Sequence, residues 1–255
     1  MRLDQCTWPE VETYLRASDG VILPTGSTEQ HGPIGLIGTD SLCAQDIADG
    51  AGAIAAAMVA PVIGYTPAAF NMAFPGTVSV SVETYTRLVT DIVDSLIQHG
   101  FRHIYILNAH GANLEPLQAV IAKKPAAFRL RSWWDFEPVN ALRRDYYGDW
   151  EGMHATPSEI AITQFRHRVI KGDNLAPPEK LTPQYIRDHA GDRHGPPDEH
   201  RAQFPDGRVG SHSGLATPEQ GRALFESAIA AVTDDYAAFL ETAPIGRRGA
   251  LPERP

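Results

Sequence analysis

The chain has 255 residues, of which 43% are hydrophobic and 21% are charged, and its formal net charge is −9. Such a composition is ordinary for a globular protein and excludes disorder of the whole chain. The acidic balance argues against nucleic acid and against an anionic membrane surface as partners, because both select clustered lysine and arginine.

Cysteine and hydropathy narrow the class of protein further. Cys6 and Cys43 are the only cysteines, too few for a disulfide framework or a thiolate metal site. Any metal would therefore be held by histidine and carboxylate side chains. The N-terminus has no signal-peptide pattern, and the most apolar stretch, 51–63, is too short to span a bilayer. The sequence predicts a cytoplasmic protein, and its ten histidines are the feature to follow.

The predicted elements alternate between helix and strand along the chain. Apolar runs predict strands and a 3.6-residue period predicts helices. In chain order we expect a helix from residue 8, a strand at 21–24, a helix at 39–57, a strand at 59–63, a turn leading into a strand at 74–80, a helix at 82–99, a strand at 103–107, a helix at 114–122, a strand at 128–133, and helices at 156–167 and 218–240.

This alternation predicts an α/β fold with a mainly parallel sheet and helices on both faces. Such folds bind their ligands outside the carboxyl ends of the strands. We predict a single domain over 1–255, with a C-terminal tail at 241–255.

The segment 172–215 differs from the rest of the chain. It contains six prolines, six glycines and four histidines and little apolar periodicity, which is typical of a functional or mobile loop. We expect a lid or a subunit contact, from which His212 could reach the cleft. A second metal cluster of His189, His194 and His200 is an alternative, but solvated loop histidines are the favoured interpretation.

Three tryptophans have two possible explanations. Trp133, Trp134 and Trp150 could line an apolar pocket wall. Packing in the core or at an oligomer interface explains them equally well.

The first chemistry-bearing motif is Gly-Ser-Thr-Glu-Gln-His-Gly-Pro at 26–33, followed by Gly-Thr-Asp at 38–40. In extended backbone Glu29 and His31 point to the same side, and Asp40 lies where the next helix should begin. Glutamate, histidine and aspartate together suit Zn²⁺ or Mn²⁺. The alternative is a surface acid, a loop histidine and a helix N-cap.

Two further motifs place histidine at comparable positions. His110, in Asn-Ala-His-Gly-Ala-Asn, follows the predicted central strand, although Asn and Gly also build simple turns. His154 precedes a predicted helix that has Glu159 in its first turn, where a capping box with Thr156 is the alternative. Together the three segments indicate a two-metal site, which activates water and polarises a carbonyl.

These motifs resemble those of the creatininase (creatinine amidohydrolase) family. The similarity runs in family order from about residue 5 to 240, through Pro-Thr-Gly-Ser-Thr-Glu-Gln-His-Gly-Pro with Gly-Thr-Asp, Phe-Pro-Gly-Thr-Val-Ser, Asn-Ala-His-Gly-Ala-Asn, His-Ala-Thr-Pro-Ser-Glu and Gly-Leu-Ala-Thr-Pro-Glu-Gln-Gly. The resemblance implies a three-layer α/β/α fold, two divalent metal ions (Zn, Mn or Fe) per subunit, and a homo-oligomer, often a hexamer.

The resemblance also implies roles for particular residues. It implies metal ligation by Glu29, His31, Asp40, His110 and Glu159, with Asp40 bridging, and an acid/base role for His154. One departure is Ala112, where creatininase itself has a carboxylate ligand, so creatinine as substrate does not follow. Ile34 and Gly35 replace the His-Leu of many members, a change expected to alter the pocket.

The function expected from these residues is a metal-dependent amidohydrolase. It would cleave a non-peptide C–N bond of a small cyclic amide or formamide through a metal-bridging hydroxide, with His154 protonating the leaving nitrogen. The alternatives are a mycofactocin-type metallopeptidase acting on a short peptide, and a non-catalytic metal-binding assembly protein.

Overall fold

A four-stranded parallel sheet forms the centre of the protein in the computed structural model, which describes residues 1–242. The strand order is β2–β1–β3–β4, made by Met58–Val59, Gly20–Thr25, His103–Asn108 and Ala127–Ser132. β1 and β3 pair along their whole length, from Gly20 opposite His103 to Thr25 opposite Asn108. The predicted parallel sheet is confirmed.

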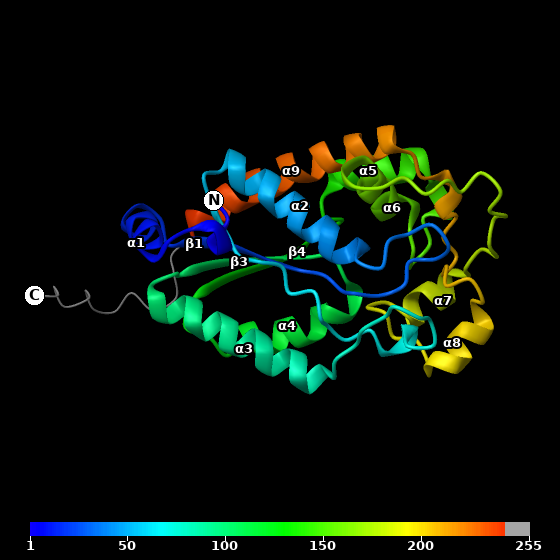
Figure 1. The fold of residues 1–255 in the computed structure, drawn as a ribbon, viewed down its shortest axis with the longest axis horizontal. Helices are drawn as coiled ribbons and strands as arrows, with labels where there is room; N and C mark the ends of the chain where they lie inside the picture. The colour runs from blue at the N-terminus through cyan, green and yellow to red at the C-terminus, as the bar shows by residue number, and fades with distance from the viewer. Residues whose placement is uncertain (243–255) are drawn as a thin grey trace, which may run out of the picture.

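Helices cover both faces of the sheet, which gives the three layers visible in Figure 1. One layer holds α2 (Thr39–Ile54), α5 (Glu137–Tyr146), α6 (Pro157–Arg166) and α9 (Pro218–Leu240). The opposite layer holds α3 (Val82–His99) and α4 (Leu114–Ile121), and α1 (Trp8–Ala17) packs against the same hydrophobic cluster as α3. The predicted α/β/α sandwich is therefore correct.

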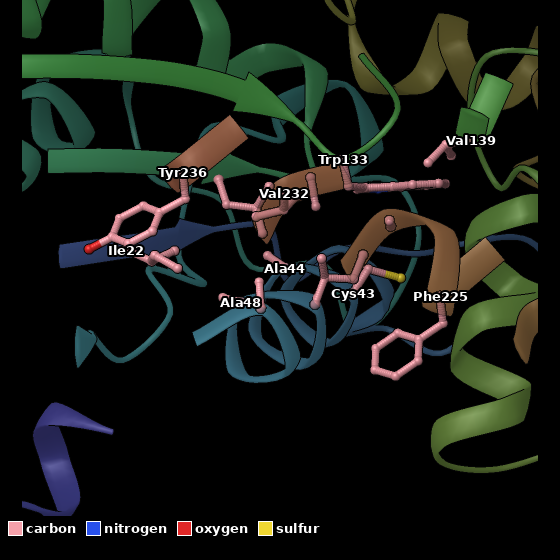
Figure 2. Packing of buried hydrophobic residues seen from close by; sticks show 14 of the residues in the cluster. Ile22, Cys43, Ala44, Ala48, Trp133, Val139, Phe225, Val232 and Tyr236 are labelled. Atoms are coloured by element: carbon pink, nitrogen blue, oxygen red, sulfur yellow. The ribbon is translucent and has the colours of Figure 1, made fainter. Parts of the chain in front are cut away.

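The two cores follow from the alternation of side chains along each strand. In β1, Ile22 packs into the cluster shared with α2 and α9, whereas Val21 and Leu23 pack into the cluster shared with α3. Figure 2 shows the first cluster, where Ala44 and Ala48 of α2 lie near Val232 of α9. Small side chains let these helices pack closely. Cys43 is fully buried there, as expected of a small hydrophobe.

Local signals in the sequence fix the ends of the clearest helix. The Ser81 side chain accepts a hydrogen bond from the backbone N–H of Thr84, which caps the start of α3. Gly100 ends α3 with φ of 114°, a conformation that favours glycine. The predicted helix over 82–99 matches α3.

Two predicted strands differ from the structure. The strand expected at 59–63 is only the two-residue β2, because Pro61 has no N–H to donate, and Ile63 forms an isolated bridge with Thr25. The strand expected within 74–80 is absent among the described residues, where Val78 makes one antiparallel bridge to Thr28.

The segment 172–215 and its neighbours contain more helix than we expected. It holds α7 (Pro183–Asp188) and α8 (Pro197–Gln203), and α5 was not predicted either. The tail predicted at 241–255 falls outside the described residues except for its first two. Within 1–242, no helix is long and apolar enough to cross a membrane.

Candidate active site

The site lies where the direction of strand order reverses. After β1 the chain adds β2 on one side, and it later adds β3 on the other side, so a crevice forms at the carboxyl ends of β1 and β3. Glu29 follows β1, His110 follows β3, and Asp40 is the second residue of α2. The strand ends and the helix start thus bring together residues that are far apart in sequence.

Glu29, Asp40 and His110 form one compact group of ligand atoms. Nδ1 of His110 lies 3.1 Å from Oε1 of Glu29 and 3.2 Å from Oδ2 of Asp40. All three side chains are at most 3% exposed. Among the described residues, neither of those two carboxylate oxygens has a hydrogen-bond partner of acceptable geometry. Buried polar atoms without partners are costly, so this group is suited to a cation.

His31, Asp40 and Glu159 form a second group that shares Asp40 with the first. Nε2 of His31 lies 2.8 Å from Oδ1 of Asp40 and 3.7 Å from Oε1 of Glu159. Each oxygen of Asp40 therefore faces a different histidine. A carboxylate with one oxygen toward each group is the arrangement that a bridging ligand requires.

Glu159 belongs to this group and to a helix cap at the same time. Its Oε1 accepts a hydrogen bond of 2.6 Å from the backbone N–H of Thr156, and its own N–H donates to the Thr156 hydroxyl. The capping box that we considered as an alternative is therefore present. It places the carboxyl group at the cluster, so the two interpretations hold together.

The electrostatics of the cluster also fit cations. Burial alone would lower the pKa of His31, but the carboxylates of Asp40 and Glu159 outweigh it and raise the pKa to about 10. At His110, burial again lowers the pKa of the imidazole. The nearby carboxylates of Glu29 and Asp40 outweigh this effect and raise the pKa well above the usual value for histidine. The carboxylates thus hold protons on both imidazoles. Divalent cations would balance the same negative charge, and ligation releases those protons.

His154 lies beside the cluster and, with Glu29 and His31, forms a third group of possible ligand atoms. Its Nε2 lies 2.7 Å from the carbonyl oxygen of Gln30, which assigns the ring hydrogen to Nε2 as donor. The other nitrogen, Nδ1, lies 3.7 Å from Oε1 of Glu29. Burial lowers the pKa of His154 to about 3, so the imidazole is neutral and Nδ1 carries a lone pair; once protonated, the ring would readily give up its proton.

All six residues singled out in the sequence meet at this place. Glu29, Asp40, His110, His154 and Glu159 line a cavity of about 200 Å³, which we call the site cavity, and the ring of His31 lies 4.6 Å from that of His154. Ile34 and Gly35 do not line the cavity, and Ile34 packs beside Ala155 and Ile160 instead.

The tryptophans separate into two environments. Trp133 and Trp134 line the site cavity and also pack in the main hydrophobic cluster, so the pocket-wall and core-packing interpretations both hold for them. Trp150 is not among its lining residues. The ring of His212 packs edge-on against Trp150, with centroids 5.7 Å apart, and His212 does not line the site cavity either.

The loop histidines contradict the expectation of solvated side chains. His194 and His200 are buried around Phe70, with ring centroids 4.8 and 5.1 Å from it. His189 stacks on Tyr185 at 3.8 Å. The cause is tertiary, because Phe70 comes from a distant part of the chain. Among the described residues, these three histidines form no metal-binding group with one another.

Asp192 is a site residue that the sequence analysis missed. It lines the site cavity, and its Oδ2 lies 3.6 Å from Nδ1 of His110. Its only local signal is a Gly-Asp pair in a loop, at which Asp192 has a positive φ of 56°. That pattern is common in turns, so it does not predict a position in the site.

The fold and the buried cluster define an α/β protein with a candidate two-metal centre. The profile of the creatininase family, described as creatinine amidohydrolase, matches residues 4–235. The chain belongs to the creatininase family.

Particular relatives are moderately similar to the chain. The creatinine amidohydrolase of Pseudomonas putida is 28% identical over 178 residues, 62% of this chain and 68% of that protein. The mycofactocin precursor peptide peptidase of Mycolicibacterium smegmatis is 36% identical over 108 residues, and the match spans only 40% of this chain and 43% of that protein.

Solved creatininase structures share the fold. A crystal structure of creatinine amidohydrolase has a TM-score of 0.75 and 22% identity, covering 95% of this chain and 98% of that chain. Similar solved structures include a manganese form of creatininase and a mutant of Zn-Zn type.

Proposed function

We propose that this chain is a metal-dependent amidohydrolase that cleaves a non-peptide C–N bond in a small cyclic amide or formamide. The observation that carries the proposal is the sharing of Asp40 by two of the three buried groups of ligand atoms. Glu29, Asp40 and His110 would hold one divalent ion, and the second would be held by His31, Asp40 and Glu159. Zinc, manganese and iron all suit this donor set.

The residues of the site have separable tasks. When bound, two divalent ions supply Lewis acidity that activates water and polarises a carbonyl. Nδ1 of His154 faces the same cavity as Glu29; it would take the proton that the attacking water loses and deliver it to the leaving nitrogen as the C–N bond breaks. The hydrogen bond from Nε2 of His154 to the Gln30 carbonyl keeps the ring in this orientation. Trp133 and Trp134 provide an apolar wall.

A short-peptide substrate is the second candidate. The similarity to the Mycolicibacterium smegmatis peptidase supports it. A larger cavity of about 760 Å³ adjoins the site cavity, and both are lined by Gly111, Leu114, Gly191 and Asp192. This larger space would accommodate residues of a peptide beyond the scissile bond, whereas a cyclic amide would need only the site cavity.

Metal analysis and a substrate panel test the proposal together. The purified protein is stripped with a chelator, reloaded with Zn²⁺, Mn²⁺ or Fe²⁺, and assayed on cyclic amides, formamides and short peptides. We expect the chain to bind two equivalents of metal ion and to hydrolyse an amide or a formamide. The chelator should abolish this hydrolysis. Hydrolysis of peptides alone supports the second candidate. Two equivalents without any hydrolysis support a non-catalytic metal-binding assembly protein, and less than one equivalent contradicts all three functions.

Two further expectations accompany this function. We propose a homo-oligomer, a hexamer by resemblance, which light scattering on the purified protein would test. We also propose a cytoplasmic location, which fractionation of the source cells would test.

A further inference from the structure

Asp192 reaches the metal cluster from the segment 172–215. Its side chain is 11% exposed, and its Oδ2 accepts a hydrogen bond of 3.0 Å from the backbone N–H of Ala112. A Cβ on Gly111 would lie only 2.4 Å from the same oxygen. The absence of a side chain at Gly111 therefore gives the Asp192 carboxylate room beside His110.

Nδ1 of His110 has three carboxylate oxygens around it. They belong to Glu29 at 3.1 Å, Asp40 at 3.2 Å and Asp192 at 3.6 Å. Atoms that ligate one zinc ion at about 2.0–2.2 Å lie roughly 3.0–3.6 Å from one another in tetrahedral or octahedral geometry. The distance from Asp192 to His110 falls within this interval. Asp192 is outside the three groups whose ligand atoms all lie within 4.8 Å of one another, so ligation would require its carboxylate to move toward Glu29 and Asp40.

The hydrogen bond to Ala112 leaves Asp192 able to ligate. A carboxylate has about four lone-pair sites on its two oxygens, and the Ala112 N–H occupies only one of them. The other oxygen, Oδ1, lies 4.0 Å from Nε2 of His194. That nitrogen is buried and has no hydrogen-bond partner among the described residues, and the His194 ring packs on Phe70. The packing of His194 on Phe70 holds this part of the loop against the rest of the protein.

We propose that Asp192 is a further metal ligand, which supplies from the segment 172–215 the carboxylate that Ala112 lacks. It would ligate the ion assigned to Glu29, Asp40 and His110, so the inference rests on the proposed function. The loop then has a chemical task in the centre, in addition to forming a wall of both cavities. Binding of that ion would therefore stabilise the segment 172–215 in the position seen here.

The direct test compares the metal affinity of four variants with the unaltered chain. Asp192→Ala removes the carboxylate, and Asp192→Asn keeps its size. Asp188→Asn is the control, because Asp188 lies in α7 of the same segment, does not line the site cavity, and its Oδ1 accepts a hydrogen bond from the Gln184 side chain. In the double variant Asp192→Ala with Ala112→Glu, a carboxylate returns at the position of Ala112.

The readout is Zn²⁺ or Mn²⁺ binding measured by competition with a chromophoric chelator. We expect Asp192→Ala to weaken one of two equivalents by about tenfold or more and Asp192→Asn to weaken it less. Asp188→Asn should bind like the unaltered chain, and the double variant should recover part of the loss. Limited proteolysis should show that metal protects 172–215 in the unaltered chain and protects it less in Asp192→Ala.

The outcomes separate this inference from the function on which it rests. If the unaltered chain binds two equivalents and Asp192→Ala binds both with unchanged affinity, Asp192 is no ligand and the proposed function stands. If the unaltered chain binds less than one equivalent, both proposals are wrong. Circular dichroism and thermal unfolding of the metal-free variants establish whether each one folds. If Asp192→Ala does not fold, Asp192→Asn provides the test in its place.

Discussion

Oδ1 of Asp40 lies 2.8 Å from Nε2 of His31 in the buried centre of the protein. The second oxygen of the same carboxylate faces His110 at 3.2 Å. Because Asp40 serves both groups of ligand atoms, Asp40→Asn should release both ions and reduce hydrolysis by at least about 100-fold. Metal content by mass spectrometry checks this result. Asp46→Asn, in the same helix but outside the site cavity, should keep both ions, and retention of two ions by Asp40→Asn would contradict a bridging role.

His154 forms a group of possible ligand atoms with Glu29 and His31, so its variant separates an acid/base role, which we expect and which leaves both ions bound, from ligation, which would lose one. The change His154→Gln removes the ring nitrogen that faces Glu29, and loss of a positioned acid/base group costs about 10²–10⁴-fold in kcat. Steady-state kinetics at saturating metal measure this loss. His212→Ala is the matched control, because His212 lies beside Trp150 and outside the site cavity. Full kcat in His154→Gln with both ions bound would exclude the acid/base role.

The two roles of Glu159 can be separated by a pair of substitutions. Thr156→Ala removes the side-chain half of the cap and should lower the free energy of unfolding by about 1 kcal/mol without loss of metal. Glu159→Gln keeps an oxygen for the Thr156 N–H but removes the charge, so the helix should persist while one ion is lost. Chemical denaturation and metal analysis of both variants distinguish these effects, and equal metal loss in both would contradict the assignment.

Close contact between α6 and α9 positions Glu159. A Cβ on Gly221 of α9 would lie 1.9 Å from the carbonyl oxygen of Ala161 in α6. Gly221→Ala should therefore separate the helices and destabilise the protein by about 1–3 kcal/mol. Thermal unfolding measures this, with Gly195→Ala as control because an added Cβ there meets only the end of the Glu199 side chain at 3.7 Å. Unchanged stability of Gly221→Ala would show that the packing accommodates the methyl group.

Acid should destabilise the metal-free protein through its buried loop histidines. Burial lowers the pKa of His200 to about 4 and that of His194 to about 3, whereas unfolded histidine titrates near 6.5. As the pH falls below 6.5, the unfolded chain binds protons first, so this part of the stability is present above pH 6.5 and is lost toward pH 4. Urea unfolding of chelated protein at several pH values measures the slope.

The variant His200→Phe provides the comparison for the acid effect. Phenylalanine keeps an aromatic ring beside Phe70 and Phe204 and does not titrate. We expect a smaller loss of stability between pH 7 and pH 5 than in the unaltered chain. An identical slope in the two proteins would assign the acid sensitivity to other groups.

Much of the fold was predictable because its signals are local. The period of α3, its Ser81 cap and Gly100 at its end lie within one stretch of sequence, and the apolar runs of β1 and β3 needed no distant information. The prediction failed where a pattern had no partner to pair with. The segment 74–80 contains β-branched residues typical of a strand. Its residue Val78 forms one bridge, to Thr28, because strand formation depends on a neighbouring strand.

The sequence by itself determined the chemistry of the candidate site. Glu29, Asp40 and His110 were candidates because each lies after a predicted strand or at the start of a predicted helix and has a donor type that suits divalent cations, whereas their assignment as ligands, and that of Glu159, came from the resemblance to the creatininase family. Residue identity, position relative to local elements and the order of the motifs along the chain were sufficient for that step.

Only the tertiary structure decided what joins and surrounds these residues. The Ala112 N–H that binds Asp192 is 80 residues away in sequence, and no periodicity in the segment 172–215 indicates this contact. His200 is buried because Phe70 packs against it. The physical reason is the same in both cases. The burial of a side chain and the distances between ligand atoms depend on packing between segments distant in sequence, and local propensity does not predict that packing.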